Sequence, residues 1–224
     1  RGLGDVYKRQ RGLGDVYKRQ VPPGDAIAQE AAATRDMPAP ADAVHESIDV
    51  AGTARSYWLV APGGAGQKPR PLLFVLHGGA TDDGRVTFRL GFQDLAVREG
   101  FVTVHPEGLG AGWNDGRETA FLLGRNGPAG APDDVAFIKA LIAKFTASGL
   151  ADPRRVYVTG GSNGGLMALR LACDLADHLA AVAVFSANMS TNYLPRCAPS
   201  RPIPILLVSG TADQLMPYDG GPVA

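Results

Sequence analysis

The chain has 224 residues with 22 basic and 22 acidic side chains, and 45% of its residues are hydrophobic. This composition is ordinary for a globular protein, and no apolar run is long enough to indicate a segment that spans a bilayer. The length suits a single domain with a sizeable core once the first residues are set aside.

Residues 1–10 and 11–20 are identical copies of the decapeptide RGLGDVYKRQ. Structural repeats diverge and each must bury a hydrophobic face, whereas this decapeptide carries only Leu, Val and Tyr and does not recur. It is similar to one reading frame of a transposon-end sequencing adapter, so we interpret residues 1–20 as an adapter-derived artefact. Without its six basic and two acidic side chains, the remainder holds 16 basic and 20 acidic residues. We therefore expect no nucleic-acid partner.

Residues 21–44 are rich in Ala, Pro and Asp and have no periodicity, which is typical of a disordered leader or linker. Such a segment often follows a signal peptide or a lipobox. We expect a secreted or periplasmic protein, with a lipid anchor left open, and one folded domain over residues 45–224.

Strand-like and helix-like segments alternate after the leader, which predicts a mostly parallel sheet with helices on both faces. An antiparallel hairpin is expected first, turning at Ala51–Gly52. Continuous apolar runs then predict buried strands. The expected strands are Glu46–Val50, Arg55–Ala61, Leu72–Leu76, Phe101–Val104, Val156–Thr159, Ala181–Phe185 and Ile203–Val208.

Two helices are expected between these strands. Thr87–Glu99 is followed by Gly100, a residue that commonly ends a helix. Asp133–Ala147 has apolar residues at three- and four-residue steps and two acidic residues at its start. The glycine-rich residues 108–132 predict a long loop beside the pocket.

A serine between glycines marks the strongest candidate site. Gly160-Gly-Ser162-Asn-Gly164 fits G-x-S-x-G, the nucleophile elbow of α/β-hydrolases, between an apolar strand and a helical segment. The sharp turn would expose the Ser162 hydroxyl, and glycines at 160 and 164 would keep Cβ atoms out of the bend. A phosphate-binding loop and a plain tight turn are the alternatives, but no Gly-Lys-Ser/Thr or G-x-G-x-x-G pattern occurs here. The elbow predicts acyl transfer.

Cys173 and Cys197 are the two cysteines of the chain. Two unrelated buried thiols are one interpretation. A disulfide between the helix after the elbow and the loop after the next strand is the other, and it would imply an oxidising compartment.

Several motifs together resemble the polyhydroxybutyrate depolymerase-like esterases, a group similar to feruloyl and acetylxylan esterases. They are LLFVLHGG, GWNDGR, DDVAFIKALI, DPRRVYVTGGSNGG and SGTADQLMPYDGG, spread over roughly residues 45–224. The resemblance implies the α/β-hydrolase fold and a serine carboxylic-ester hydrolase that acts through an acyl-enzyme. Polyhydroxyalkanoate, feruloyl or acetyl polysaccharide and small esters are the implied substrates, and no metal or organic cofactor is expected.

The resemblance also assigns roles to residues. Ser162 matches the nucleophile and Asp213 the acid that orients the base, although an Asp in this position also suits a turn. Backbone N–H groups of Gly79 and Asn163 match the oxyanion hole. Trp113 and Asn114 match a loop that borders the pocket, where Trp113 contacts substrate or packs the loop on the core.

A triad of this fold needs a histidine after the acid, yet none of the four histidines follows Asp213. His45, His77, His105 and His178 each suit a structural role. We therefore expect a C-terminal truncation that removes the base together with the last strand and helix, and a fragment that is inactive. A peptidase of the same fold and a non-catalytic binding relative are the alternative functions.

Overall fold

The computed structural model describes residues 38–63, 68–79, 81, 83–110, 112–117 and 131–221, and the predictions for residues 1–20 and most of the leader lie outside them. The strands are β1 (Ala43–Val50), β2 (Thr53–Val60), β3 (Arg70–Leu76), β4 (Val102–Pro106), β5 (Ala151–Gly161), β6 (Ala181–Phe185) and β7 (Ile205–Val208). The helices are the 3-10 turns η1 (Gly84–Leu90) and η4 (Leu194–Arg196) and the α-helices α3 (Phe92–Glu99), α4 (Asp134–Ala147) and α5 (Asn163–Asp174).

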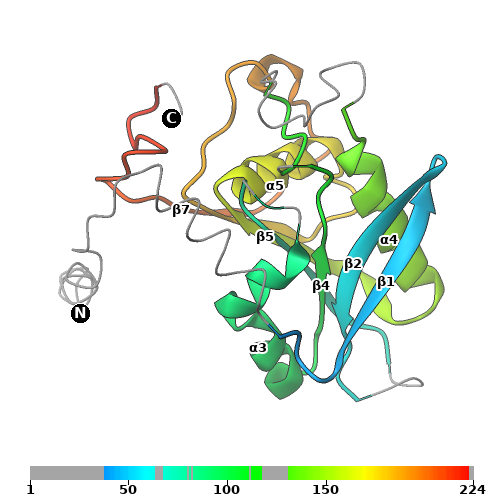
Figure 1. Cartoon of the computed structure of the whole chain (residues 1–224). Coiled ribbons are helices and arrows are strands. Elements are labelled where there is room, and N and C mark those ends of the chain that lie inside the picture. The colour runs from blue at the N-terminus through cyan, green and yellow to red at the C-terminus, as the bar shows by residue number, and fades with distance from the viewer. Residues whose placement is uncertain are drawn as a thin grey trace, which may run out of the picture. The chain divides into compact units, whose positions relative to one another are not determined.

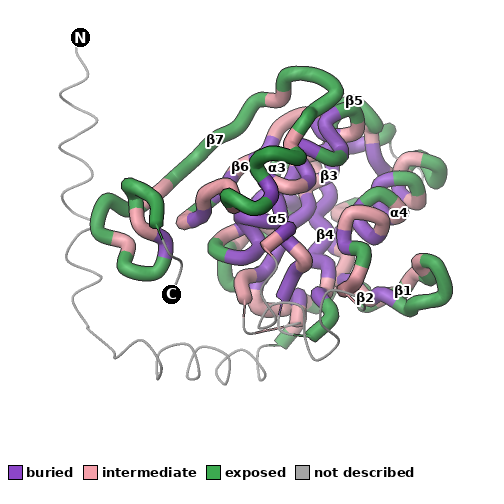
Figure 2. Tube along the Cα trace, turned by 90° about the horizontal axis from the view of Figure 1, so that it is seen from above, coloured by how far each residue is buried: buried purple, intermediate pink, exposed green. Residues whose placement is uncertain are grey.

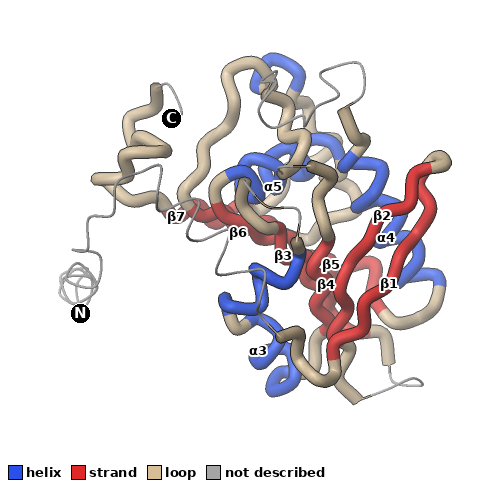
Figure 3. The backbone as a smooth tube through the Cα atoms, in the orientation of Figure 1, coloured by secondary structure: helices blue, strands red, loops and turns tan. Residues whose placement is uncertain are grey.

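The strands form one sheet in the order β1-β2-β4-β3-β5-β6-β7 (Figures 1 and 3). β1 pairs with β2 and β2 pairs with β4 in antiparallel fashion, while β4, β3, β5, β6 and β7 run parallel to one another. The hairpin turns at Ala51 and Gly52, whose φ angles of 52° and 83° suit the tight turn between two strands. The mostly parallel sheet and the hairpin are confirmed.

The two faces of the sheet carry different helices, because side chains alternate along each strand. Leu72, Phe74 and Leu76 of β3 belong to the main core together with buried residues of α4 and α5. The opposite face meets η1, where Phe88 packs on His105 of β4 with ring centroids 4.3 Å apart. The helices therefore cover both faces, as predicted.

The helix predicted over Thr87–Glu99 is wrong as a single element. The chain forms η1, then turns at Gly91 with φ of 72°, and starts α3 at Phe92. The Gly91 N–H donates to Phe88 O at 3.1 Å, which closes the first element. Glycine adopts a left-handed conformation without steric cost, so Gly91 ends the first helical element although the apolar spacing continues across it.

β7 lies at the edge of the sheet and is exposed along its whole length (Figure 2). Its apolar side chains keep between 44% and 58% of their surface, namely Ile205, Leu206, Leu207 and Val208. Central parallel strands are normally covered on both faces, so this strand lacks the packing that its composition predicts. Among the described helices, none has the length and apolar character needed to cross a membrane.

His105 of β4 is a fully buried titratable group of the sheet. Its Nδ1 lies 2.5 Å from Thr87 Oγ1 and its Nε2 lies 3.1 Å from Thr103 Oγ1. Burial lowers the pKa of His105 from 6.5 to about 3, because the charged imidazolium would lose its hydration. The folded protein therefore holds this ring neutral.

The buried His105 predicts a loss of stability in mild acid. In the unfolded chain His105 becomes protonated below pH 6.5, whereas in the folded protein it becomes protonated only near pH 3. The free energy of unfolding therefore falls as the pH drops from 6.5 towards 3. The loss between pH 7 and pH 5 amounts to about 2 kcal/mol from this group. Urea unfolding at pH 7 and pH 5 measures the loss of stability between the two pH values. This loss should be about 2 kcal/mol smaller in His105→Gln than in the parent and should be unchanged in His178→Gln. An equal loss in both variants would contradict the assignment.

Candidate active site

Ser162 sits at the turn between β5 and α5 with φ of 52° and ψ of −125°. Its N–H donates to Phe185 O of β6 at 3.0 Å, and its carbonyl accepts the first helical bond, from Leu166 N at 3.0 Å. A serine before a helix ordinarily caps it with its hydroxyl, but Ser162 makes no side-chain cap bond. The residue is exposed, so the turn directs its Oγ away from the helix and leaves it accessible.

The glycines around Ser162 permit close backbone contacts. A Cβ on Gly160 would lie 2.5 Å from the carbonyl of Gly164, and a Cβ on Gly164 would lie 2.4 Å from His77 O and 2.5 Å from Leu76 O. A Cβ on Gly165 would lie 2.8 Å from Ala187 Cβ. The elbow therefore packs directly on the end of β3 and on the loop that follows it, and the predicted need for glycine at 160 and 164 is confirmed.

The predicted oxyanion donors come from two segments beside Ser162. A Cβ on Gly78 would lie 3.8 Å from Ser162 Cβ, which places the His77–Gly79 loop next to Ser162. A Cβ on Gly112 would lie 3.5 Å from Gly79 Cα and 2.3 Å from Asn163 Oδ1, so Gly112 lies between these two residues. The N–H of Asn163 opens α5 and has no acceptor within the helix. Their role as oxyanion donors stays a prediction.

The side chain of Asn163 binds the GWNDGR loop, a contact that the sequence did not indicate. Its Oδ1 accepts from Trp113 N at 2.7 Å, and its Nδ2 donates to Trp113 O at 3.1 Å and to Asp115 Oδ2 at 2.5 Å. Asp115 is almost fully buried and also binds Arg117 at 2.7 Å. The loop is thus bonded to Asn163, the residue after Ser162.

Trp113 and Asn114 were expected to border the pocket. Trp113 is completely buried, its Nε1 donates to His77 O at 2.9 Å, and its ring centroid lies 4.6 Å from that of His77. Asn114 donates its N–H to Asp134 Oδ2 at 2.7 Å and its side chain to Pro132 O at 3.1 Å. Of the two roles considered for Trp113, this geometry favours packing of the loop on the core.

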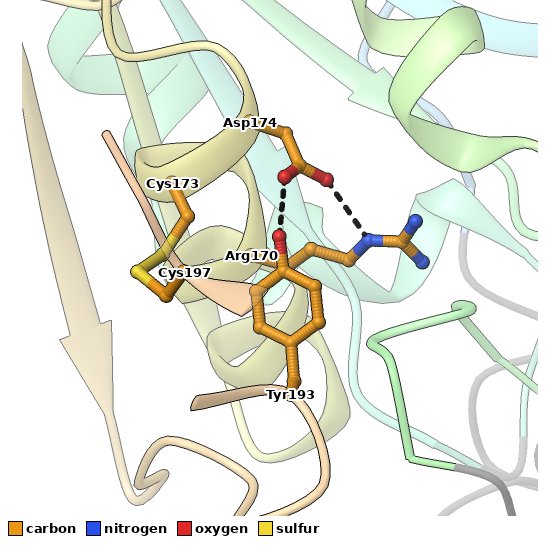
Figure 4. Close-up of a disulfide and its surroundings, with 5 residues drawn as sticks. All are labelled: Arg170, Cys173, Asp174, Tyr193 and Cys197. Carbon is orange, nitrogen blue, oxygen red and sulfur yellow. Dashed lines mark hydrogen bonds and ion pairs between the residues drawn. A yellow bond between two sulfur atoms is a disulfide. The ribbon is translucent and has the colours of Figure 1, made fainter. Parts of the chain in front are cut away.

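A disulfide joins Cys173 of α5 to Cys197, with the two Cα atoms 5.1 Å apart (Figure 4). Beside it, the Tyr193 hydroxyl donates to Asp174, whose other oxygen accepts from Arg170 Nε at 3.2 Å. Burial and the neighbouring Asp174 raise the pKa of Tyr193 to about 12. This cluster reaches the GWNDGR loop, because Arg170 donates to Asn114 O at 2.7 Å.

Asp213 follows β7, in the turn after Gly210. Its Oδ1 accepts from the N–H groups of Leu215 and Met216, both at 3.0 Å, which is the turn geometry considered as the alternative role. β5, β6 and β7 are parallel neighbours, so Ser162 and Asp213 both follow carboxyl ends at one edge of the sheet. β6 lies between β5 and β7, so two strand spacings, about 10 Å in total, separate the strands that precede the two residues. The triad role of Asp213 stays a prediction.

Each of the four histidines has hydrogen-bond or ion-pair partners of its own. His77 Nδ1 donates to Gly78 O at 2.8 Å, and its Nε2 accepts from Gly108 N at 3.0 Å. One donor nitrogen and one acceptor nitrogen are the pattern of a neutral imidazole. His105 bonds to Thr87 and Thr103, while His45 lies 3.2 Å from Glu107 and His178 lies 2.7 Å from Asp177. No group of His, Cys, Asp and Glu in the described ranges is arranged to hold a metal ion.

The profile of a family described as "Esterase PHB depolymerase" matches residues 55–194, which include Ser162 and the GWNDGR loop. The chain belongs to this family. The resemblance to polyhydroxybutyrate depolymerase-like and feruloyl esterase-like α/β-hydrolases is thereby confirmed.

Individual relatives agree with the family. The chain is 35% identical over 187 residues to a putative esterase, NocK, of Nocardia uniformis subsp. tsuyamanensis, covering 81% of this chain and 52% of that protein. It is 37% identical over 123 residues to feruloyl esterase B of Piromyces equi, covering 50% of this chain and 23% of that protein. The chain thus spans about half the length of the first relative and about a quarter of the second.

The solved structures establish the fold. A cold-adapted esterase from an Arctic intertidal metagenomic library superposes with a TM-score of 0.60 at 19% identity, covering 82% of this chain and 79% of that one. A thermostable esterase gives a TM-score of 0.59 at 19% identity, covering 80% of this chain and 49% of that one. The predicted α/β-hydrolase fold is confirmed.

Proposed function

We propose that the full-length protein is a serine carboxylic-ester hydrolase in which Ser162 is the nucleophile. The observation that carries this proposal is the conformation of Ser162, whose left-handed φ of 52° leaves its hydroxyl uncapped at the start of α5. A hydroxyl held in this way serves no structural bond, and sharp strand-to-helix turns of this kind present nucleophiles. The esterase family of the chain supports the same reaction.

In the proposed reaction, Ser162 Oγ attacks the ester carbonyl carbon while a histidine base accepts its proton. The N–H groups of Gly79 and Asn163 bind the resulting oxyanion, and Asp213 orients the base and stabilises its charged form. The C–O bond then breaks, and the alcohol leaves with the proton. Water attacks the acyl-enzyme, gives its proton to the base, and releases the acid and free Ser162. Because the four histidines serve other contacts, the base is proposed to come from a part of the protein outside this chain.

The proposed substrates are polyhydroxyalkanoates, feruloyl or acetyl polysaccharides, and small esters. The name feruloyl esterase B belongs to one relative and supports the feruloyl substrates by similarity. The Cys173–Cys197 disulfide supports a secreted or periplasmic location, since disulfides persist in oxidising compartments.

Ser162→Ala in the full-length protein should lower kcat for p-nitrophenyl acetate and methyl ferulate by about 10⁴- to 10⁶-fold. A fluorophosphonate probe should label the parent on Ser162, detected by peptide mass spectrometry, and should not label the variant. The exposed Ser200 provides a control, because Ser200→Ala should retain full activity. Ester turnover that survives Ser162→Ala would refute the mechanism, and turnover of peptide amides at a similar rate would favour a peptidase.

A further inference from the structure

A cavity of about 400 Å³ lies on the face of the β1–β2 hairpin that meets η1. One wall is formed by His45 of β1 and by Ser56 and Trp58 of β2. The other wall is formed by Asp83 and Arg85 at the start of η1, and by Glu107 after β4. None of the residues assigned to the proposed reaction lines this cavity.

The two carboxylates of the cavity are already held in place. Glu107 accepts from Trp58 Nε1 at 3.0 Å through one oxygen, while its other oxygen lies 3.2 Å from His45 Nε2. Asp83 accepts from Arg85 Nη2 at 2.6 Å and from Arg85 N at 2.8 Å, and the Arg85 contacts help to lower the pKa of Asp83. Each Asp83 oxygen accepts two hydrogen bonds from Arg85, whereas each Glu107 oxygen has a single partner, so Glu107 can accept further hydrogen bonds without reorganising.

An aromatic surface lies between these polar groups. The His45 ring stacks on Trp58 with centroids 4.5 Å apart and an angle of 24° between the planes. Phe88 holds the other side of Trp58, edge to face, at 6.1 Å. His45 keeps 45% of its side-chain surface, so the stacked pair remains accessible from solvent.

This combination of groups suits one class of ligand. A sugar ring presents C–H groups that pack on an aromatic surface and hydroxyl groups that donate to carboxylates. It carries no charge, so it avoids the repulsion that Glu107 would exert on a carboxylate ligand. A purely apolar ligand would cover the free lone pairs of Glu107 without offering a donor, which costs desolvation energy. We propose that this cavity binds a sugar unit of a carbohydrate ligand.

The cavity is connected to the turn that carries Ser162 through Gly108 and His77. Gly108 lines the cavity and donates its N–H to His77 Nε2 at 3.0 Å. The carbonyl of His77 packs against Gly164, two residues after Ser162. Given the proposed esterase function, on which this step rests, the bound sugar belongs to the carbohydrate that carries the ester. Binding itself does not depend on that function.

Binding is tested with xylotetraose and cellotetraose added to full-length Ser162→Ala protein, in which the ligand is not consumed. Binding is followed by isothermal titration calorimetry, which measures the heat released when each sugar is added. We expect a saturable heat signal with one of the two sugars. Glu107→Gln and His45→Ala should each weaken binding about tenfold, the first through loss of a charged acceptor and the second through loss of the ring stacked on Trp58. Glu99→Gln, an exposed carboxylate outside the cavity, should leave it unchanged.

Circular dichroism and the melting temperature show whether each variant is folded, and His45→Ala serves if Glu107→Gln does not fold. Absence of a saturable heat signal with either sugar would overturn the proposal, as would binding that neither cavity variant weakens. Tighter binding of ferulate than of the sugars would also overturn it. Sugar binding combined with ester turnover that survives Ser162→Ala would refute the proposed function and leave the cavity assignment standing.

Discussion

Replacing Arg55 with alanine is expected to lower the free energy of unfolding by about 3–5 kcal/mol. Arg55 donates to Asp134 Oδ1 at 2.6 Å, with 2% and 0% of the two side chains exposed, and its guanidinium lies 4.1 Å from the centroid of Phe137. Burial raises the pKa of Asp134, and without Arg55 this carboxyl would stay in the core without its ion-pair partner. Urea unfolding at pH 7 measures the loss.

A matched arginine provides the control for this prediction. Arg98 contacts Glu99 at 3.0 Å, but 71% and 57% of these side chains are exposed. Exposed ion pairs contribute little to stability, so Arg98→Ala should leave the urea midpoint almost unchanged. The double variant Arg55→Leu with Asp134→Leu should recover much of the lost stability, because it removes both buried charges. Equal losses in Arg55→Ala and Arg98→Ala would show that the buried pair does not form.

The second large effect is expected from Gly164→Ala. The new Cβ would lie 2.4 Å from His77 O and 2.5 Å from Leu76 O, and both oxygens belong to the backbone. Overpacking of this kind costs about 1–3 kcal/mol, and the elbow or the His77–Gly79 loop must shift to relieve it. Because a displacement of about 1 Å lowers catalytic rates by about 100-fold, ester hydrolysis by the full-length protein should fall by a similar factor.

Gly161→Ala is the control for the elbow. Its Cβ would lie 3.7 Å from Phe185 O, an ordinary contact, so the urea midpoint should stay close to that of the parent. Paired measurements of urea unfolding and p-nitrophenyl acetate hydrolysis separate the two effects. A Gly164→Ala protein with the stability and turnover of the parent would contradict the close contact between the elbow and the end of β3.

Local patterns predicted most of the fold. Apolar runs such as Leu72–Leu76 indicated strands because a central parallel strand is buried on both faces. The start of β5 was missed: it begins at Ala151, and the pairing register shifts between Arg70 and Leu72. The break at Gly91 was also missed, because the apolar spacing around it continues while the backbone conformation changes.

The contacts that support the site could not be predicted in the same way. Arg55 and Asp134 lie 79 positions apart, and Asn163 binds Trp113 across 50 positions. Such pairs depend on which elements the fold brings together, and no local spacing records them. One sequence feature of this contact is visible, namely the glycine at position 112. Gly112 adopts φ of 150°, and a Cβ there would lie 2.3 Å from Asn163 Oδ1.

The backbone of Ser162 implies a conflict between stability and reactivity in this domain. A non-glycine residue held at φ of 52° and ψ of −125° stores about 1–3 kcal/mol of conformational energy. Glycine would adopt the same angles freely, so the most stable sequence at this position has no hydroxyl at all. Selection for thermal stability alone would therefore tend to replace Ser162, the proposed nucleophile. Stabilising substitutions in this domain must be made at other positions if that hydroxyl is to be kept.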